Sequence, residues 1–364
     1  MLFMFKVLGV DSDRSAALLA SWQNGSLASV ETSIRGGKEL SLEELTALST
    51  KFVESDTIEE KRKYFGLLDE ISKSKYAKTL NPVSPIWGNG VDAKNIALAV
   101  DTTKLLNSVG IRSAYNFPTE TSQILEKAYF RPETKDAALK SFEFFSMKPQ
   151  CSISEATART FVEAIIDPLQ TKAIRESHYK TLCRLVKNDS TILRYGEKLF
   201  NSLLEQMKPL DPISGMKDFV SFGFKPSDKL LSFVITKLPE VRLASLFQKM
   251  QSLRTSISDA NILSLSKYLE TSSTARDALD SLCAISVYQE IPAQARIILC
   301  RMIDKPECTV LQTKIHETLS RGTSPFTDEM LALIAPEDKT LGPNSIKTLS
   351  SRGVLSERIV KHLA

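Results

Sequence analysis

Histidine and cysteine, the side chains that most often build metal and nucleophilic sites, are scarce in this chain. Its 364 residues include 3 histidines and 5 cysteines, and no His-x-His, His-Glu-x-x-His or Cys-x-x-Cys spacing occurs. A zinc site is therefore not expected. The cysteines are odd in number, widely spaced and mostly set among aliphatic residues, which is typical of reduced core thiols in a reducing compartment rather than of a secreted protein. They are Cys151, Cys183, Cys283, Cys300 and Cys308.

Glycine is also scarce, at 14 residues. Phosphate-binding loops need several glycines at fixed offsets, so that backbone amides can approach the anion. Gly36-Gly37 and Gly88-Asn89-Gly90 complete no such motif, and there is no Gly-x-Ser-x-Gly elbow. A nucleophilic relay would need one of the histidines as its base, and Cys151 with His178 is the pairing to consider. We predict that the chain is not an enzyme and takes no cofactor or small-molecule substrate. An enzyme with a cryptic helical site is the third-ranked alternative.

Long apolar runs and a dominant charge sign are missing as well. The most apolar segment, Met1 to Val10, contains Lys6 and is well short of the ~18–20 residues of a membrane span, so no membrane insertion is expected. The acids in Asp11-Ser12-Asp13 fit neither a secretory signal nor an acid-poor mitochondrial presequence. We interpret that tripeptide as a helix cap rather than a metal-binding pair. The net charge of +4 is too small to indicate nucleic-acid binding, so any basic patch is local.

What the sequence does have is apolar residues at spacings of three and four, with no Asn-Gly or Asp-Gly hairpin between alternating runs. The clearest stripe runs from Thr191 to Met207 and predicts one packed helix. Short connections make successive helices antiparallel neighbours. We therefore expect an all-α fold of stacked antiparallel helix pairs, an α-solenoid-like helical-repeat array. Helices are predicted near residues 12–23, 26–35, 42–54, 57–74, 91–109, 119–130, 134–146, 153–166, 169–187, 191–207, 212–222, 227–237, 240–254, 259–270, 274–288, 293–303, 308–320, 328–335 and 344–362.

Helix starts are predicted where a side-chain oxygen is followed three residues later by a carboxylate, since the two can satisfy free amides of the first turn. Proline after an aspartate marks further starts, because its missing amide hydrogen costs nothing at the first helical position. The first kind comprises Ser41 with Glu44, Asp56 with Glu59, Ser152 with Glu155 and Ser256 with Asp259, and the second comprises Asp167-Pro168 and Asp211-Pro212.

The longest stretch predicted to lack regular structure is Asn81 to Gly90, in which two prolines and two glycines surround Trp87. We interpret it as a domain boundary or a docking loop. The alternative is that Trp87 simply pins the loop onto the helices, since tryptophan gains much from burial. The predicted organisation is an N-terminal helical region at residues 1–80, a Pro/Gly loop at 81–90 and a helical-repeat array at 91–364.

One helix opening recurs along the chain. Ser152-Ile153-Ser154-Glu155-Ala156 and Ser256-Ile257-Ser258-Asp259-Ala260 lie 104 residues apart. Ser41-Leu42-Glu43-Glu44-Leu45 is a looser copy, and Pro325-Phe326-Thr327-Asp328-Glu329 is a fourth echo. In each, an apolar residue beside the cap can staple the entering chain to its helix, and a carboxylate lies in the first turn. The spacing would hold three units of roughly 35 residues, within the range of two-helix repeats.

The segments 40–48, Leu-Ser-Leu-Glu-Glu-Leu-Thr-Ala-Leu, and 256–265, Ser-Ile-Ser-Asp-Ala-Asn-Ile-Leu-Ser-Leu, carry a family resemblance. They resemble units of the degenerate helical-repeat proteins of organelles, the octotricopeptide, heptatricopeptide and FAST-kinase-like families. The resemblance implies stacked helix pairs that bind organellar RNA or serve in organellar ribonucleoproteins. The chain departs from these families in showing no regular period across all units and no C-terminal nuclease-like domain.

One charged surface stands above the background between residues 171 and 198. On the helix predicted at 169–187, Lys172, Lys180, Arg184 and Lys187 fall within one arc of about 120°, opposite an apolar stripe. Such an arc can sit on phosphates, and Tyr179 lies beside its edge, where a base could stack. The alternative is an ordinary solvated face. A weaker basic candidate near the C-terminus consists of Lys347, Arg352, Arg358 and Lys361.

Taken together, these features predict a non-catalytic helical-repeat scaffold within a large organellar assembly. The first hypothesis is a subunit of a mitochondrial ribonucleoprotein such as the mitochondrial ribosome, contacting RNA through the arc and partner proteins elsewhere. The second is a pure protein-protein interaction subunit of a respiratory or ATP-synthase complex, whose concave apolar surface grips partner helices. Loss of partners on nuclease treatment separates the first from the second.

Overall fold

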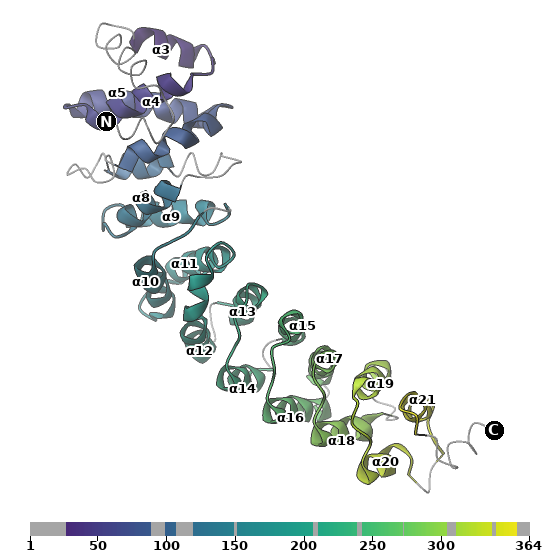
Figure 1. Cartoon of the computed structure of the whole chain (residues 1–364). Coiled ribbons are helices and arrows are strands. Elements are labelled where there is room, and N and C mark those ends of the chain that lie inside the picture. The colour runs from purple at the N-terminus through teal and green to yellow at the C-terminus, as the bar shows by residue number, and fades with distance from the viewer. Residues whose placement is uncertain are drawn as a thin grey trace. The chain divides into compact units, whose positions relative to one another are not determined.

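The structure, a computed structural model, describes residues 27–88, 99–106, 119–148, 151–206, 210–238, 242–271, 273–303, 311–336 and 340–354. Every regular element within these ranges is a helix, which confirms the predicted all-α fold (Figure 1). The chain divides into two compact units, residues 1–192 and 193–364, whereas the sequence analysis places a boundary at 81–90. The predicted helix at 12–23 and the Asp11-Ser12-Asp13 cap lie outside the described residues.

Unit 1 packs its helices in sequence order, α4 on α5, α8 on α9 and α10 on α11. Around α8 to α11 its core is a group of rings, Tyr129, Phe142, Phe161 and His178, with centroids 5.0–6.4 Å apart and edge-on geometries. Residues 99–106 are also helical. The elements are α3 (Leu27–Arg35), α4 (Leu42–Glu54), α5 (Ile58–Lys73), the 3₁₀ helix η1 (Ala77–Trp87), α8 (Thr119–Tyr129), α9 (Lys135–Phe145), α10 (Glu155–Ile166) and α11 (Lys172–Leu185).

Unit 2 arranges its helices in two rows. Each helix packs on the next helix of its own row (Figure 1). One row consists, in order, of α12, α14, α16, α18 and α20, and the other of α13, α15, α17, α19 and α21. This is the predicted stacking of helix pairs. After η2 (Ser190–Tyr195), which crosses the boundary between the units, the elements are α12 (Gly196–Gln206), α13 (Pro212–Ser221), α14 (Asp228–Thr236), α15 (Ala244–Leu253), α16 (Asp259–Lys267), η3 (Tyr268–Glu270), α17 (Ala275–Ser286), α18 (Ala293–Met302), α19 (Gln312–Arg321), α20 (Asp328–Ile334) and α21 (Pro343–Ser351).

The recurring opening is the start of the first helix in a pair. Its cap is one serine later than predicted: Ser154 caps α10 and accepts a hydrogen bond from the Thr157 amide, and Ser258 precedes α16. The residue before each cap is buried, Ile153 at 7% and Ile257 at 1% exposed. Because the buried isoleucine packs at the start of the helix that follows, its position decides which serine becomes the cap. The start of α10 and the start of α16 lie 104 residues apart, and α12 and α14 begin between them, so this spacing spans three helix pairs.

Hydrogen bonds between equivalent places in successive pairs tie unit 2 together. The Glu197 carboxylate accepts from the Ser227 amide at 3.3 Å, and the Asp228 carboxylate accepts from the Ser258 amide at 3.2 Å. In the other row, Asp277 of α17 accepts from the amide of Leu243, the residue that precedes α15, at 2.6 Å. Leu243 has no capping side chain of its own. Each carboxylate therefore satisfies helix-terminal amides of a neighbouring pair.

The Pro/Gly segment differs from its prediction. Residues 77–87 form the 3₁₀ helix η1, which contains Pro82 and Pro85, instead of an irregular loop. Trp87 at its end is fully buried, which supports the interpretation that the ring pins this segment onto the helices. The short i to i+3 turns of a 3₁₀ helix tolerate proline better than an α-helix does, because fewer amides are needed to hold them. Asn89 and Gly90 lie outside the described residues.

The predicted helix at 191–207 is two elements. Asp189 accepts hydrogen bonds from the Thr191 amide and hydroxyl, and this local turn starts η2 rather than an α-helix. The α-helix begins at Gly196, where an added Cβ would come within 2.7 Å of the Phe224 ring. Close approach of that ring therefore requires glycine at the first helical residue.

Of the four other predicted helix starts, two form as predicted and two do not. The Ser41–Glu44 capping box is present in full, and Asp211 caps α13 ahead of Pro212. Thr57 caps α5 in place of Asp56. Asp167-Pro168 is a turn rather than a helix start, because the Asp167 carboxylate accepts from the Leu169 amide and Thr171 caps α11. Side chains competing for the same amides decide these local differences.

Candidate functional site

The predicted basic arc lies on α11 and, for Lys187, two residues beyond its end. Lys172, Lys180, Arg184 and Lys187 are all exposed, and we call them the α11 cationic face. Leu182, Leu185 and Val186, on the opposite arc, are buried. Thr171 caps the helix, and its first turn carries no acid, so the positive end of the helix dipole is not compensated there. The surface therefore presents cations on a helix that is held by its apolar side.

Two of the four cations have protein partners. Lys172 forms an ion pair with Glu176 one turn along the helix, at 3.7 Å. Arg184 donates from Nη1 to the main-chain oxygen of Glu143 in the last turn of α9, at 2.9 Å, where helix carbonyls lack intrahelical donors. Lys180 and Lys187 have no partner within the described part of the chain. The available positive charge is therefore centred on these two lysines.

Tyr179 does not take the position expected for it. Its side chain is 8% exposed, so its ring offers no open face on which a base could stack. At 100° per residue, Tyr179 lies about 40° from Arg175 and about 60° from Leu182 around α11, and both of those side chains are buried. Arg175 donates from Nε to the main-chain oxygen of Ile165 at 2.7 Å and likewise belongs to the interior. The sequence placed Tyr179 at the edge of the arc, and packing turns that edge inward.

Cys151 and His178 do not form a nucleophile and base. The His178 Nδ1–H donates to the main-chain oxygen of Ile174 at 2.7 Å, so Nε2 accepts from the Tyr129 hydroxyl, also at 2.7 Å. Burial lowers the pKa of His178 and raises the pKa of the Cys151 thiol to about 12. Cys151 instead accepts a weak hydrogen bond from the Ser122 hydroxyl. A buried neutral thiol is a poor nucleophile.

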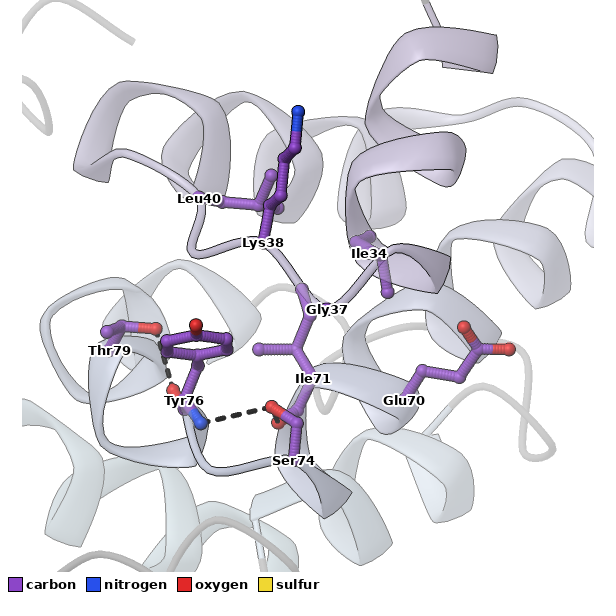
Figure 2. A pocket seen from close by; sticks show the side chains of 9 residues that line it. All are labelled: Ile34, Gly37, Lys38, Leu40, Glu70, Ile71, Ser74, Tyr76 and Thr79. Carbon is purple, nitrogen blue, oxygen red and sulfur yellow. Dashed lines mark hydrogen bonds between the residues drawn. The ribbon is translucent and has the colours of Figure 1, made fainter.

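A small pocket lies between the end of α3 and the end of α5 (Figure 2). Its Ser74 and Thr79 hydroxyls are already engaged: the Tyr76 amide donates to the Ser74 hydroxyl at 3.1 Å, and the Thr79 hydroxyl donates to the Tyr76 main-chain oxygen at 2.7 Å. Its volume of about 70 Å³ is far below the several hundred Å³ of typical small-molecule sites. It is lined by Ile34, Gly37, Lys38, Leu40, Glu70, Ile71, Ser74, Tyr76 and Thr79.

The weaker C-terminal basic candidate contains one engaged cation. Arg352 donates to the main-chain oxygen of Ser324 and lies 5.3 Å from the Phe326 ring centroid. Arg296, which is 5% exposed, donates to the same oxygen at 2.8 Å. Lys347 is exposed, while Arg358 and Lys361 lie outside the described residues. Arg296 escaped the sequence analysis, although an arginine inside the apolar run Ala295 to Leu299 was a visible signal of a buried cation.

Two further features are absent from the described ranges. No cluster of three or more His, Cys, Asp or Glu side chains is placed to hold a metal ion there. None of the described helices combines the length and apolar character that crossing a bilayer requires.

Comparison with known proteins supports the fold. No protein-family model and no curated protein matches the chain in sequence. Among solved structures, it is similar to an engineered protein determined by the Northeast Structural Genomics Consortium, with a TM-score of 0.51 and 11% identity, over 88% of this chain and 91% of that one. At that identity the likeness shows the helical fold and carries no function.

Proposed function

We propose that the chain is a non-catalytic helical-repeat scaffold in an organellar ribonucleoprotein assembly, such as the mitochondrial ribosome, and that it contacts RNA through the α11 cationic face. The observation that carries the proposal is a pair of exposed lysines, Lys180 and Lys187, that have no partner among the described residues and share one face with Lys172 and Arg184. Phosphates are natural partners for such a face. The organelle and the ribonucleoprotein enter through the family resemblance of segments 40–48 and 256–265.

The second candidate is a scaffold that binds only proteins. Arg184 is committed to the Glu143 main-chain oxygen, Lys172 is paired with Glu176, and Tyr179 is buried, which leaves less of the arc for RNA than its sequence suggests. Stacked helix pairs such as those of unit 2 also suit extended protein contacts.

Co-purification from the native source, with and without nuclease, separates the two candidates. We expect partners to be lost on nuclease treatment if RNA holds them, and an unchanged set of partners would favour the protein-only scaffold. The variant with Lys172, Lys180, Arg184 and Lys187 changed to Gln should lose the nuclease-sensitive partners. The matched control changes four exposed cations of unit 2 to Gln, namely Lys225, Lys229, Lys267 and Arg276, and should keep them. Exposed substitutions alter stability by about 0.5 kcal/mol or less, so both variants should fold.

A further inference from the structure

The α11 cationic face is long, and hydrogen bonds hold its helix against neighbouring elements. From Lys172 to Lys187 it extends about 22 Å at 1.5 Å per residue. Its C-terminal end is fixed to α9, because Arg184 donates to the Glu143 main-chain oxygen at 2.9 Å and Asn188 donates to that of Lys148 at 2.6 Å. The hydrogen bond that the Tyr129 hydroxyl of α8 donates to the buried His178 ring holds the middle of the helix. The cations therefore project from a helix whose position is fixed.

This face has no surface on which a base can stack. Tyr179 is 8% exposed, and the remaining side chains of the exposed arc are Ala173, Glu176 and Cys183. The guanidinium of Arg184, which could otherwise stack on a base, is held by Glu143. The exposed aromatic within the described part of unit 1 is Phe130, at 52%, and it lies in the turn after α8 rather than on α9 or α11. The face can therefore reach phosphates but cannot read bases.

Single-stranded and base-paired RNA respond differently to such a face. A single strand gains much of its affinity from bases stacked on aromatic rings, and here it would have to order its backbone along the helix without that gain. A duplex already holds its phosphates in fixed positions, and proteins recognise it through shape and backbone contacts. A rigid row of cations without rings thus suits the duplex.

We infer that the α11 cationic face binds the phosphate backbone of base-paired RNA without reading its sequence. The inference rests on the proposed function and narrows it from RNA to a duplex segment. The absence of acid in the first turn of α11 favours a phosphate at the Lys172 end, since helix N-termini attract anions. Lys180 and Lys187 supply the contacts for which no group in the described part of the chain competes.

The test compares the full chain binding to an RNA hairpin of about 16 base pairs and to an unstructured strand with the same number of phosphates, over a series of salt concentrations. We expect the hairpin to bind about tenfold more tightly, because it is already ordered and loses less conformational entropy on binding. Scrambling the paired sequence should leave the affinity unchanged. Changing Lys180 and Lys187 to Gln should flatten the slope of log affinity against log salt for the hairpin by about 2, from two lost phosphate contacts.

The control variant changes the exposed Lys229 and Lys267 to Gln and should keep the wild-type slope. If the single strand binds as tightly as the hairpin, or if scrambling changes the affinity, the duplex inference is overturned while RNA contact stands. If neither RNA binds, or if the slope is unchanged in the Lys180/Lys187 variant, the proposed function fails together with the inference. Thermal midpoints of both variants within about 2–4 °C of wild type establish that the fold is retained.

Discussion

The two units stack helices of similar length and share caps between successive pairs, yet the cores that hold their helices together differ. In unit 1, α8 to α11 meet around Tyr129, Phe142, Phe161 and His178, whose rings contact edge-on. Unit 2 has a ring cluster at its first pair, and from α14 onward its pairs are tied by side chain to backbone hydrogen bonds across 28–38 residues.

The shared cap does not depend on one repeat length. In unit 2, α12, α14 and α16 begin 31–32 residues apart, at Gly196, Asp228 and Asp259, and equivalent carboxylates come into register with the next cap. In unit 1, α8 and α10 begin 36 residues apart, yet Glu126 of α8 accepts from the Ser154 amide at the start of α10. The ring cluster of unit 1 is therefore packed in addition to a shared cap rather than in place of one, and burial of its rings supplies a weakly directional contribution.

The strongest way to break unit 1 is to remove its central ring. Phe161 is fully buried and lies 5.0 Å from both the Tyr129 and the His178 ring centroids. We expect Phe161→Ala to lower the free energy of unfolding of unit 1 by about 3–5 kcal/mol, measured by hydrogen exchange of α8 to α11. Phe130→Ala, at a 52% exposed ring, serves as the control. Equal effects of the two changes would show that the cluster is not the core of this unit.

The matching change in unit 2 removes a shared cap. Asp277 accepts from the amides of Leu243 and Ala244 at 2.6 and 3.3 Å, so Asp277→Ala should destabilise the start of α15 by about 1–2 kcal/mol. Faster hydrogen exchange in the first turn of α15, rather than in α17 where the change is made, is the diagnostic result. Glu270→Ala, an exposed acid of η3, should leave α15 unaffected.

Acid should weaken unit 1 through His178. Burial lowers the pKa of its ring below the usual 6.5, so the unfolded chain binds this proton at a higher pH than the folded chain. The stabilisation is complete above pH 6.5 and declines as pH falls from there toward the folded pKa, by up to about 1.4 kcal/mol per pH unit.

Urea unfolding at several pH values measures this dependence. In His178→Gln, the pH dependence of the unfolding free energy of unit 1 should disappear, although this variant is less stable than the wild type at every pH. His316 in unit 2 also has a lowered pKa, chiefly from burial, and it should keep its own contribution in that variant. An unchanged pH profile in His178→Gln would contradict the assignment of this slope to the ring cluster.

The smallest expected effect is a gain in unit 2. Arg254, which ends α15, has φ of 47° in the left-handed region, where a side chain is strained and glycine is not. The equivalent turn after α13 uses Gly223, at φ of 107°. Arg254→Gly should raise stability by about 0.5 kcal/mol, as relief of strain outweighs the added freedom of the unfolded chain. A loss in thermal midpoint would mean that the arginine side chain contributes contacts of its own.

Local sequence patterns predicted the helices well, whereas tertiary contacts decided the caps and the side-chain burial that the sequence did not predict. The Ser41–Glu44 box forms as expected, because both partners lie within one helical turn. The choice of Ser154 over Ser152 depends on Ile153 entering the core, and the burial of Tyr179 depends on what packs against that edge of α11. The bond between Asp277 and Leu243 crosses 34 residues, a distance that no local pattern reports.

For the α11 cationic face, the sequence predicted which side chains share an arc but not their partners. The exposure of Lys180 and Lys187 follows from helical periodicity alone. The engagement of Arg184 by Glu143 depends on the placement of α9 beside α11, and the length of the connection between them leaves that placement open. Partners drawn from another helix are the part of a site that periodicity cannot supply.

The shared caps of unit 2 also bear on how this unit folds. The hydrogen bonds from Ser227 to Glu197 and from Ser258 to Asp228 each close a loop of 30 residues, and the main packing joins each helix to the next or the one after. Low contact order of this kind favours rapid folding, and in a linear array structure can nucleate at one pair and propagate to its neighbours. As the chain leaves the ribosome, each completed pair in unit 2 can thus act as a template for the pair synthesised after it.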